Sequence, residues 1–232
     1  MVMRQQPPVR KSVGRPRKGG QERSDSASRI LDEAEALFAE HGFHGVTLRQ
    51  IAARAKVDAA LLHYYFQHKK GLFDAVWERR AEVLNRERLD SMDRYAGAHA
   101  GQMTVEGAIE AFLGPLMDPQ RHRDAGWRNY FTLAALVSNS AAWGGEMMGR
   151  FFDPVVKRLI ELIATALPDA RREDLYWSYH MLSGALMLTL SETGRLDTLS
   201  DGLCSSADIE SLAPRMVRYA AAGFRALCQP AR

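Results

Sequence analysis

Apolar residues recur every three or four positions along almost the whole chain, and this spacing is the feature that most limits the possible folds. The recurrence starts near Ser26 and continues almost to the end of the sequence. No segment of four to eight residues alternates apolar and polar side chains in the manner of a strand. An apolar stripe with a polar opposite face is typical of helices that share one core. The sequence therefore predicts an all-α protein.

Capping residues, glycines and prolines divide this pattern into about nine helices. The first is expected at about 26–41, with Gly42 as the residue that ends it. A second begins at Thr47, which forms a capping-box pattern with Gln50 in "TLRQ", and Asp58 caps a third that reaches Phe66. The remaining helices are expected from Lys69 to about Tyr95 and near 103–117, 126–141, 145–167 with a start or kink at Pro154, 171–193, and 207–228.

Charge is distributed unevenly along the chain. The formal net charge is +3, but residues 1–23 contain seven basic residues and one acid, so they carry +6 and the other 209 residues carry −3. Residues 1–25 are rich in Pro, Gly, Ser, Arg and Lys, and such a segment buries too little apolar area to fold alone. We expect a disordered basic arm that seeks a polyanion, attached to a body that is not basic.

Several classes of protein are disfavoured. The longest strongly apolar stretch, 181–190, is too short for a membrane span and is interrupted by polar residues, and the N-terminus lacks the apolar region of a secretory signal. Cys204 and Cys228 have no metal-ligand neighbours at useful spacing, so neither a disulfide framework nor a metal site is expected. We find no GxSxG, P-loop or HExxH motif and expect no enzyme and no cofactor. A reducing cytoplasm is the simplest location.

The second and third helices have the spacing of a helix-turn-helix, which lays its second helix in the major groove of DNA. Between Thr47 and Lys70 there are five basic residues and a single acid, Asp58. A three-helix packing unit with a solvated basic face is the structural alternative.

The run "ILDEAEALFAEHGFHGVTLRQIAARAKVDAALLHYYFQHKKGLFDAV", residues 30–76, resembles the DNA-binding domain of the TetR family of bacterial transcriptional regulators. The matching features are "A..LF...G", "T...IA..A.V" and "L.YYF..K..L". The resemblance makes the structural alternative improbable. It implies a helical C-terminal part that holds an effector pocket and a dimer interface, and hence three segments: 1–25, the arm; 26–71, the DNA-binding domain; and 72–232, the effector-binding and dimerisation domain.

The resemblance also implies roles for residues of the helix-turn-helix. Arg49 is placed to reach a base edge or a phosphate, and Ala59, Ala60 and Leu61 of the next helix face the groove with apolar side chains only. His63, Tyr64 and Lys69 are placed to hold backbone phosphates, and the capping residue Thr47 can also contact a phosphate. The expected DNA-binding residues of the domain are Thr47, Arg49, Ala59, Ala60, Leu61, His63, Tyr64 and Lys69.

Two residues depart from the family pattern, and the arm adds a motif of its own. Lys56 stands where glycine is usual in the turn, which predicts backbone strain or an extra phosphate contact, and Asp58 repels DNA unless it accepts from a cytosine amine. The arm contains "VGRPRKGG", which resembles the Gly-Arg-Pro core of an AT-hook, with Arg15 and Arg17 in a narrow minor groove. A nonspecific basic tail is the alternative; both predict salt-sensitive DNA binding.

The C-terminal part is rich in large, adaptable side chains that can line an effector cavity. For each of them an ordinary core position is the alternative, and for His180 a satisfied core histidine is the more frequent case. The predicted helices 145–167 and 171–193 carry no Arg or Lys on their apolar faces, which favours a neutral or amphiphilic effector with its polar end at the mouth. The expected effector residues are Trp127, Phe131, Met148, Phe152, Trp177, His180 and Met181.

The last two long helices are expected to form a two-fold homodimer interface. The stretch 175–190 is apolar nearly all round and must be covered on both sides. A two-fold dimer also places two reading helices on a palindromic operator, in successive major grooves about 34–36 Å apart. We predict a sequence-specific DNA-binding regulator, a repressor released by a small apolar or amphiphilic effector. The alternative is an architectural DNA-binding protein without an effector.

Overall fold

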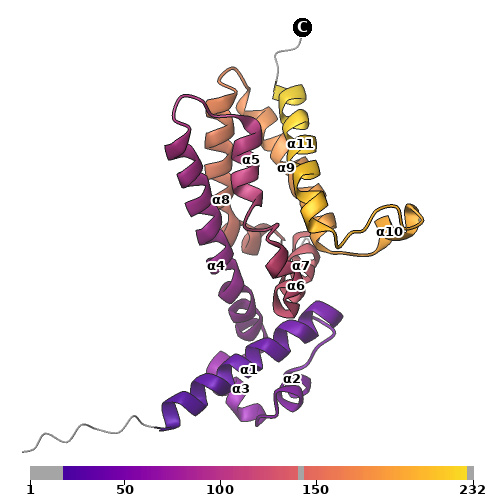
Figure 1. The fold of residues 1–232 in the computed structure, drawn as a ribbon. Helices are drawn as coiled ribbons and strands as arrows, with labels where there is room; N and C mark the ends of the chain where they lie inside the picture. Colours follow the sequence, from indigo (N-terminus) through magenta and orange to yellow (C-terminus); the bar gives the residue numbers. More distant parts are fainter. Residues whose placement is uncertain (1–17, 141–143, 229–232) are drawn as a thin grey trace, which may run out of the picture.

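The computed structural model describes residues 18–140 and 144–228, and in this part of the chain every regular element is a helix (Figure 1). The all-α prediction is confirmed, and the nine longer helices within the described ranges match the expected number. The helices are α1 (Lys18–His41), α2 (Leu48–Ala55), α3 (Ala59–Phe66), α4 (Lys69–Ala98), α5 (Val105–Leu113), α6 (Pro119–Arg123), α7 (Ala125–Ser138), α8 (Gly144–Ala166), α9 (Arg172–Leu190), α10 (Arg195–Leu199) and α11 (Ile209–Cys228). None of these helices is both long and apolar enough to cross a membrane.

Some boundaries differ from the predicted ones. Helix α1 begins at Lys18, so residues 18–25 are helical and do not belong to a disordered arm; Arg15, Arg17 and the rest of 1–17 lie outside the described residues. The helix expected at 103–117 ends at Leu113, just before Gly114 and Pro115, and the Asp118 carboxylate then caps a separate short helix, α6, at the Gln120 amide. Helix α8 runs through Pro154 without ending.

Helices α1–α3 form a unit at one end of the molecule, at the bottom of Figure 1. Ile30, Phe38, Ile51 and Leu62 are fully buried in its core. Phe38 makes an edge-to-face contact with Phe73 of α4, with ring centroids 5.1 Å apart, which fixes the unit to the start of that helix.

Helix α4 connects this unit to the rest of the molecule. Its 30 residues span about 45 Å, and it packs on α1 and α3 near its start and on α5, α7 and α8 further along. The buried stripe of α4 includes Trp77, Ala81, Leu84, Arg88 and Met92. Helix α4 therefore packs against both the helix-turn-helix unit and the upper bundle.

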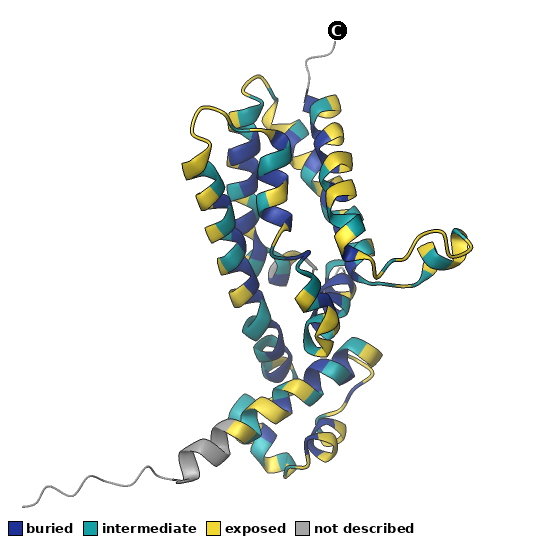
Figure 2. Cartoon of the chain, in the orientation of Figure 1, coloured by how far each residue is buried: buried dark blue, intermediate teal, exposed yellow. Residues whose placement is uncertain are grey.

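The upper bundle is built from α4, α5, α7, α8, α9 and α11, and α10 projects from it (Figure 1). Helix α9 is not covered on both sides in the single chain. Leu182 and Leu186 are buried, whereas Trp177 is 54% and Met181 57% exposed. The outer faces of α10 and α11 are largely exposed as well (Figure 2). One face of α9 is thus an apolar surface that the described chain leaves open.

Candidate DNA-binding and effector sites

Local hydrogen bonds build the helix-turn-helix. The predicted capping box is confirmed: the Gln50 amide donates to Thr47 Oγ1 at 3.3 Å, and the Thr47 amide donates to Gln50 Oε1 at 2.8 Å. Lys56 ends α2 in the left-handed region, with φ of 55°, so the expected strain is present. The Asp58 carboxylate accepts from the Ala60 amide at 2.7 Å and starts α3.

The exposed face of α3 consists of Ala60, His63 and Tyr64. Tyr64 extends far into solvent, and His63 Nδ1 lies 3.0 Å from the Gln67 carbonyl oxygen. The neighbouring Ala59 and Leu61 are half-buried and pack against the core. The face that α3 presents to solvent is therefore narrower than the predicted set and more polar.

Three basic side chains lie near this face, and they differ in whether another residue partly neutralises or covers their charge. Arg49 on α2 is exposed and has no hydrogen-bond or ion-pair partner among residues 18–140 and 144–228. Arg54 Nε donates to Glu33 at 3.0 Å, so part of its charge is neutralised. The Lys69 ammonium lies 4.5 Å from the centroid of the Phe43 ring, and partial burial lowers the pKa of Lys69. Arg49 is thus a cation available to an external anion beside α3.

An open groove of about 900 Å³ lies between α7, α8 and α9. Of the predicted effector residues, Met148, Phe152 and His180 line it. Its other lining side chains are mainly small or apolar, and among the side chains that the structure describes Asp153 is the one carboxylate that lines it. This size is within the usual range for small-molecule sites.

A smaller inner cavity of about 30 Å³ lies behind the groove, among α4, α5, α7, α8 and α9. The predicted residues Phe131, Met148 and Phe152 line it, and so do Arg88 and Tyr130. Arg88 is 3% exposed and Tyr130 1%, so both polar side chains are directed into the interior. Burial raises the pKa of Tyr130 well above its usual range.

Three predicted effector residues line neither cavity. Trp177 and Met181 lie on the exposed face of α9, because the helix turns these positions away from the groove. The Trp127 ring instead lies between two guanidinium groups, 4.9 Å from Arg80 Cζ and 4.4 Å from Arg121 Cζ. These three side chains lie outside both cavities, and composition alone does not say which face of an apolar helix is turned inward.

Comparison with known families agrees with this geometry. Residues 30–76 match the family model described as bacterial regulatory proteins, tetR family, and residues 110–223 match the model described as tetracyclin repressor-like, C-terminal domain. The chain belongs to the TetR family. Its α2–α3 segment is the helix-turn-helix of that family, and members of the family bind DNA operators and dimerise.

Curated relatives of this TetR-family chain include the HTH-type transcriptional repressor AcnR of Corynebacterium glutamicum, 29% identical over 44% of this chain and 47% of that protein. Another is the HTH-type transcriptional repressor ComR of Escherichia coli, 31% identical over 47% of this chain and 46% of that protein. The chain spans about half the length of the curated relatives it matches. The fatty acid degradation regulator FadR of Bacillus halodurans has a similar fold, with a TM-score of 0.57, 17% identity and coverage of 86% and 96%.

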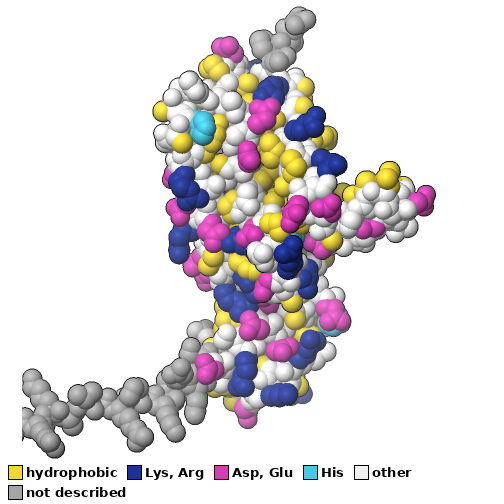
Figure 3. All heavy atoms as spheres, in the orientation of Figure 1, with side chains coloured by type: hydrophobic (Ala, Val, Ile, Leu, Met, Phe, Trp, Pro, Cys, Tyr) yellow, Lys and Arg dark blue, Asp and Glu magenta, His cyan; other side chains and the backbone are white. Residues whose placement is uncertain are grey.

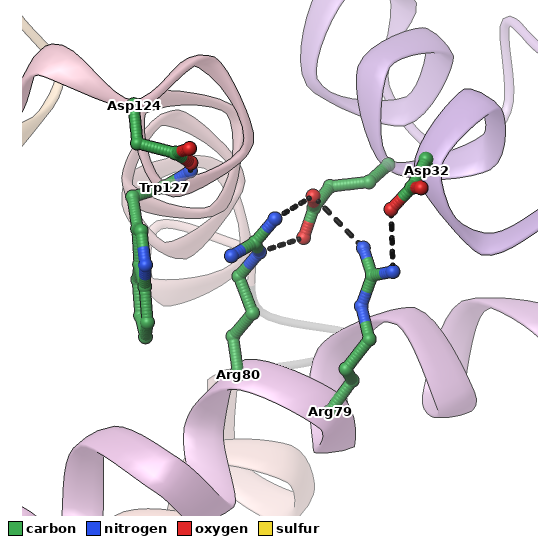
Figure 4. A network of polar contacts seen from close by, with 6 residues as sticks. Asp32, Arg79, Arg80, Asp124 and Trp127 are labelled. Atoms are coloured by element: carbon green, nitrogen blue, oxygen red, sulfur yellow. Dashed lines mark hydrogen bonds and ion pairs between the residues drawn. The ribbon is translucent and has the colours of Figure 1, made fainter. Parts of the chain in front are cut away.

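An ion-pair network around the buried Glu35 joins α1 of this TetR-family chain to α4 (Figure 4). Glu35 of α1 is 1% exposed. Arg80 Nε donates to its Oε1 at 2.7 Å and Arg80 Nη2 to its Oε2 at 2.9 Å, while Arg79 Nη2 donates to Oε2 at 3.0 Å. Arg79 also donates to Asp32 at 2.6 Å. Two carboxylates of α1 and two guanidinium groups of α4 thus neutralise each other at the domain junction.

The same network includes the start of α7. The Asp124 carboxylate caps α7 by accepting from the Trp127 amide at 2.9 Å, and the indole covers the Arg80 guanidinium. Gly126 allows this close approach, because a Cβ there would lie 2.0 Å from Arg80 Nη2. Helices α1, α4 and α7 therefore meet through one polar cluster.

Sequence reasoning missed Arg88 and the Glu35 network. The signal for Arg88 was present, since it falls on the buried stripe of α4 between Leu84 and Met92. Glu35 likewise lies next to the apolar stripe of α1, at a position where a charge is buried only with partners. The partners of Glu35 lie more than forty residues away in sequence, so no local pattern identifies them.

Proposed function

We propose that this protein is a sequence-specific DNA-binding repressor that a small apolar or amphiphilic effector releases from its operator. The observation that carries the proposal is the combination of an exposed α3 with a groove between α7, α8 and α9. The long helix α4 and the contact of α1 with α7 connect the two. AcnR and ComR, two of the matched relatives, are named as transcriptional repressors, which supports repression rather than activation. We divide the chain at about residue 71 into a DNA-binding and an effector-binding domain.

In the proposed complex, α3 enters the major groove with its exposed face. Ala60, with Ala59 and Leu61 at its sides, offers apolar contact, and His63, Tyr64 and Lys69 hold phosphates. Arg49 supplies the bidentate donor for a guanine or a phosphate, as its unpaired exposed guanidinium allows. Thr47 adds a phosphate contact at the start of α2, and Arg15 and Arg17 add salt-sensitive affinity.

We propose a homodimer formed through α9 and α11 as the DNA-binding form of the protein. The exposed apolar face of α9 around Trp177 and Met181, together with Tyr219 on α11, provides the surface. Burial of this surface against its own copy by two-fold symmetry places two α3 helices on the two halves of a palindrome. The dimer exists in two conformations that differ in the distance between the two α3 helices. The effector shifts the equilibrium between these conformations by binding one of them more tightly than the other.

Footprinting on the promoter of the adjacent transcription unit tests the proposal. We expect protection of a discrete palindrome, lost with Arg49→Ala and kept with Arg94→Ala, an exposed arginine of α4 far from α3 along the helix. Uniform protection of any A·T-rich DNA, unchanged by Arg49→Ala, would instead support the architectural alternative.

A further inference from the structure

The inner cavity contains a cation, Arg88, that no acid among the described residues neutralises. Arg88 lines this cavity, and none of the described carboxylates lies within ion-pair distance of its guanidinium. Burial lowers the pKa of Arg88 to about 10, which leaves the side chain protonated at neutral pH. A buried charge without a counter-ion is costly, so an anion that enters the cavity gains affinity by pairing with it.

Hydrogen-bond donors also remain free at this point. Arg88 Nε donates to the Phe112 carbonyl at 3.2 Å and Nη1 to Asn85 Oδ1 at 3.4 Å. A guanidinium has five N–H groups, so three have no acceptor among the described residues. The Tyr130 hydroxyl, which is buried and lines the same cavity, has no hydrogen-bond partner there either. Two polar side chains, both more than nine-tenths buried, thus offer unused donors in one small space.

The inner cavity and the groove are adjacent and share lining side chains. Met148, Phe152, Tyr179, Ser183 and Met187 line both. The inner cavity alone accommodates only a group of a few atoms, whereas the groove is large enough for a ligand body. The unbranched methionine side chains at this boundary adapt easily to an occupant. The shape therefore favours a ligand whose polar head lies inside and whose apolar body lies in the groove.

We infer that the effector is an apolar monocarboxylic acid, whose carboxylate binds at the inner end of the groove to Arg88 and Tyr130. This inference rests on the proposed function and reverses the orientation expected from the sequence, which placed the polar end at the mouth. A carboxylate matches a guanidinium in charge and in planar geometry. A dianionic phosphate fits less well, because Arg88 is the one Lys or Arg among the described residues that line either cavity, and Asp153 adds negative charge to the groove.

Neighbouring residues hold Arg88 in position. Its guanidinium carbon lies 3.8 Å from the centroid of the Phe112 ring, and Asn85 is itself anchored by donating to the Phe151 carbonyl at 2.8 Å. Arg88 lies eight residues beyond Arg80 on α4, about 12 Å along the helix. A carboxylate at Arg88 therefore acts on the helix that carries the junction with the DNA-binding domain.

Capping of α5 is the purely structural role open to Arg88, since the Phe112 carbonyl belongs to the last turn of that helix. The two roles predict different behaviour. A pure cap makes Arg88→Met destabilising and leaves ligand binding unchanged. A carboxylate receptor makes the variant lose ligand selectivity, and removal of a buried unpaired charge offsets the lost cap in the free protein.

The test measures thermal stabilisation and calorimetric binding of octanoate, decanoate and 2-naphthoate by the full chain, each against the alcohol with the same carbon skeleton. We expect at least one acid to bind wild type roughly 10- to 100-fold more tightly than its alcohol, as charge-assisted hydrogen bonds imply. Arg88→Met abolishes this preference. Tyr130→Phe weakens acid binding by about tenfold and does not lower the stability of the free protein, because the hydroxyl it removes has no partner.

Arg86→Met is the matched control, since Arg86 is an exposed arginine two residues away on the same helix, and it retains the preference for the acid. The inference is overturned if no acid is preferred over its alcohol, or if Arg88→Met still prefers the acid.

Operator binding measured in the same samples separates this inference from the proposed function. Arg88-dependent acid binding that leaves operator affinity unchanged supports the carboxylate site and refutes effector release. Operator release by acid and alcohol alike, in wild type and Arg88→Met, supports effector release and overturns the carboxylate site.

Discussion

Replacement of Glu35 by glutamine removes the carboxylate that accepts hydrogen bonds from both Arg79 and Arg80 of α4 at the domain junction. Three guanidinium hydrogen bonds end on this carboxylate, and glutamine keeps one acceptor oxygen but places an amide against two cations. Loss of one partner of a buried pair costs about 3–5 kcal/mol. The side chains of Arg79 and Arg80 remain 26% and 18% exposed, so water recovers part of this loss. We therefore expect a decrease of about 3 kcal/mol in the free energy of unfolding.

For a chain of this length that decrease corresponds to a Tm about 6–12 °C lower. Thermal and urea unfolding measure it at one fixed protein concentration, because dimerisation makes Tm depend on concentration. Glu33→Gln is the control: Glu33 lies on the same helix, and its more exposed carboxylate pairs only with Arg54, so the expected cost is below about 1 kcal/mol. Equal costs for the two variants would refute the argument that burial of Glu35 makes this network structurally important.

Three further variants probe the turn, the cap and the open face of α9. Thr47→Val removes the hydroxyl that caps α2 and should cost about 1 kcal/mol in chemical unfolding, with weaker operator binding. Lys56→Gly relieves the left-handed backbone and should stabilise the protein by about 1 kcal/mol, whereas Lys56→Ala should not; equal stability of the two would mean that the strain is absent. Met181→Glu places a charge on the exposed apolar face of α9 and should convert the dimer to monomer in light scattering, while Glu82→Gln, on an exposed part of α4, leaves it dimeric.

The helix-turn-helix could be derived from the sequence almost completely. Its helices begin and end through contacts between residues two to four positions apart, such as Thr47 with Gln50 and Asp58 with Ala60. These contacts join residues that are close together in the sequence, so the pattern specifies them directly. The same reasoning explains why the helical periodicity was sufficient for the fold class.

Short-range reasoning fails where helix ends depend on weak signals. The short helices α6 and α10, of five residues each, are below the length at which periodicity is visible. The early start of α1 at Lys18 is of the same kind, since the first turns contain the poor helix formers Gly19 and Gly20.

Only the tertiary structure decides which side chains meet in the cavity and at the junction. The inner cavity combines residues of α4, α5, α7, α8 and α9, so the chemistry at Arg88 and Tyr130 depends on how five helices pack. The apolar residues of α9 divide between the core and an open face, although all of them look alike in sequence. Hydrophobic attraction is not directional, and therefore apolar composition predicts that a helix is buried but not against which neighbour. The sequence thus identifies the helix-turn-helix, and the packing of distant segments determines the charge that the inner cavity presents.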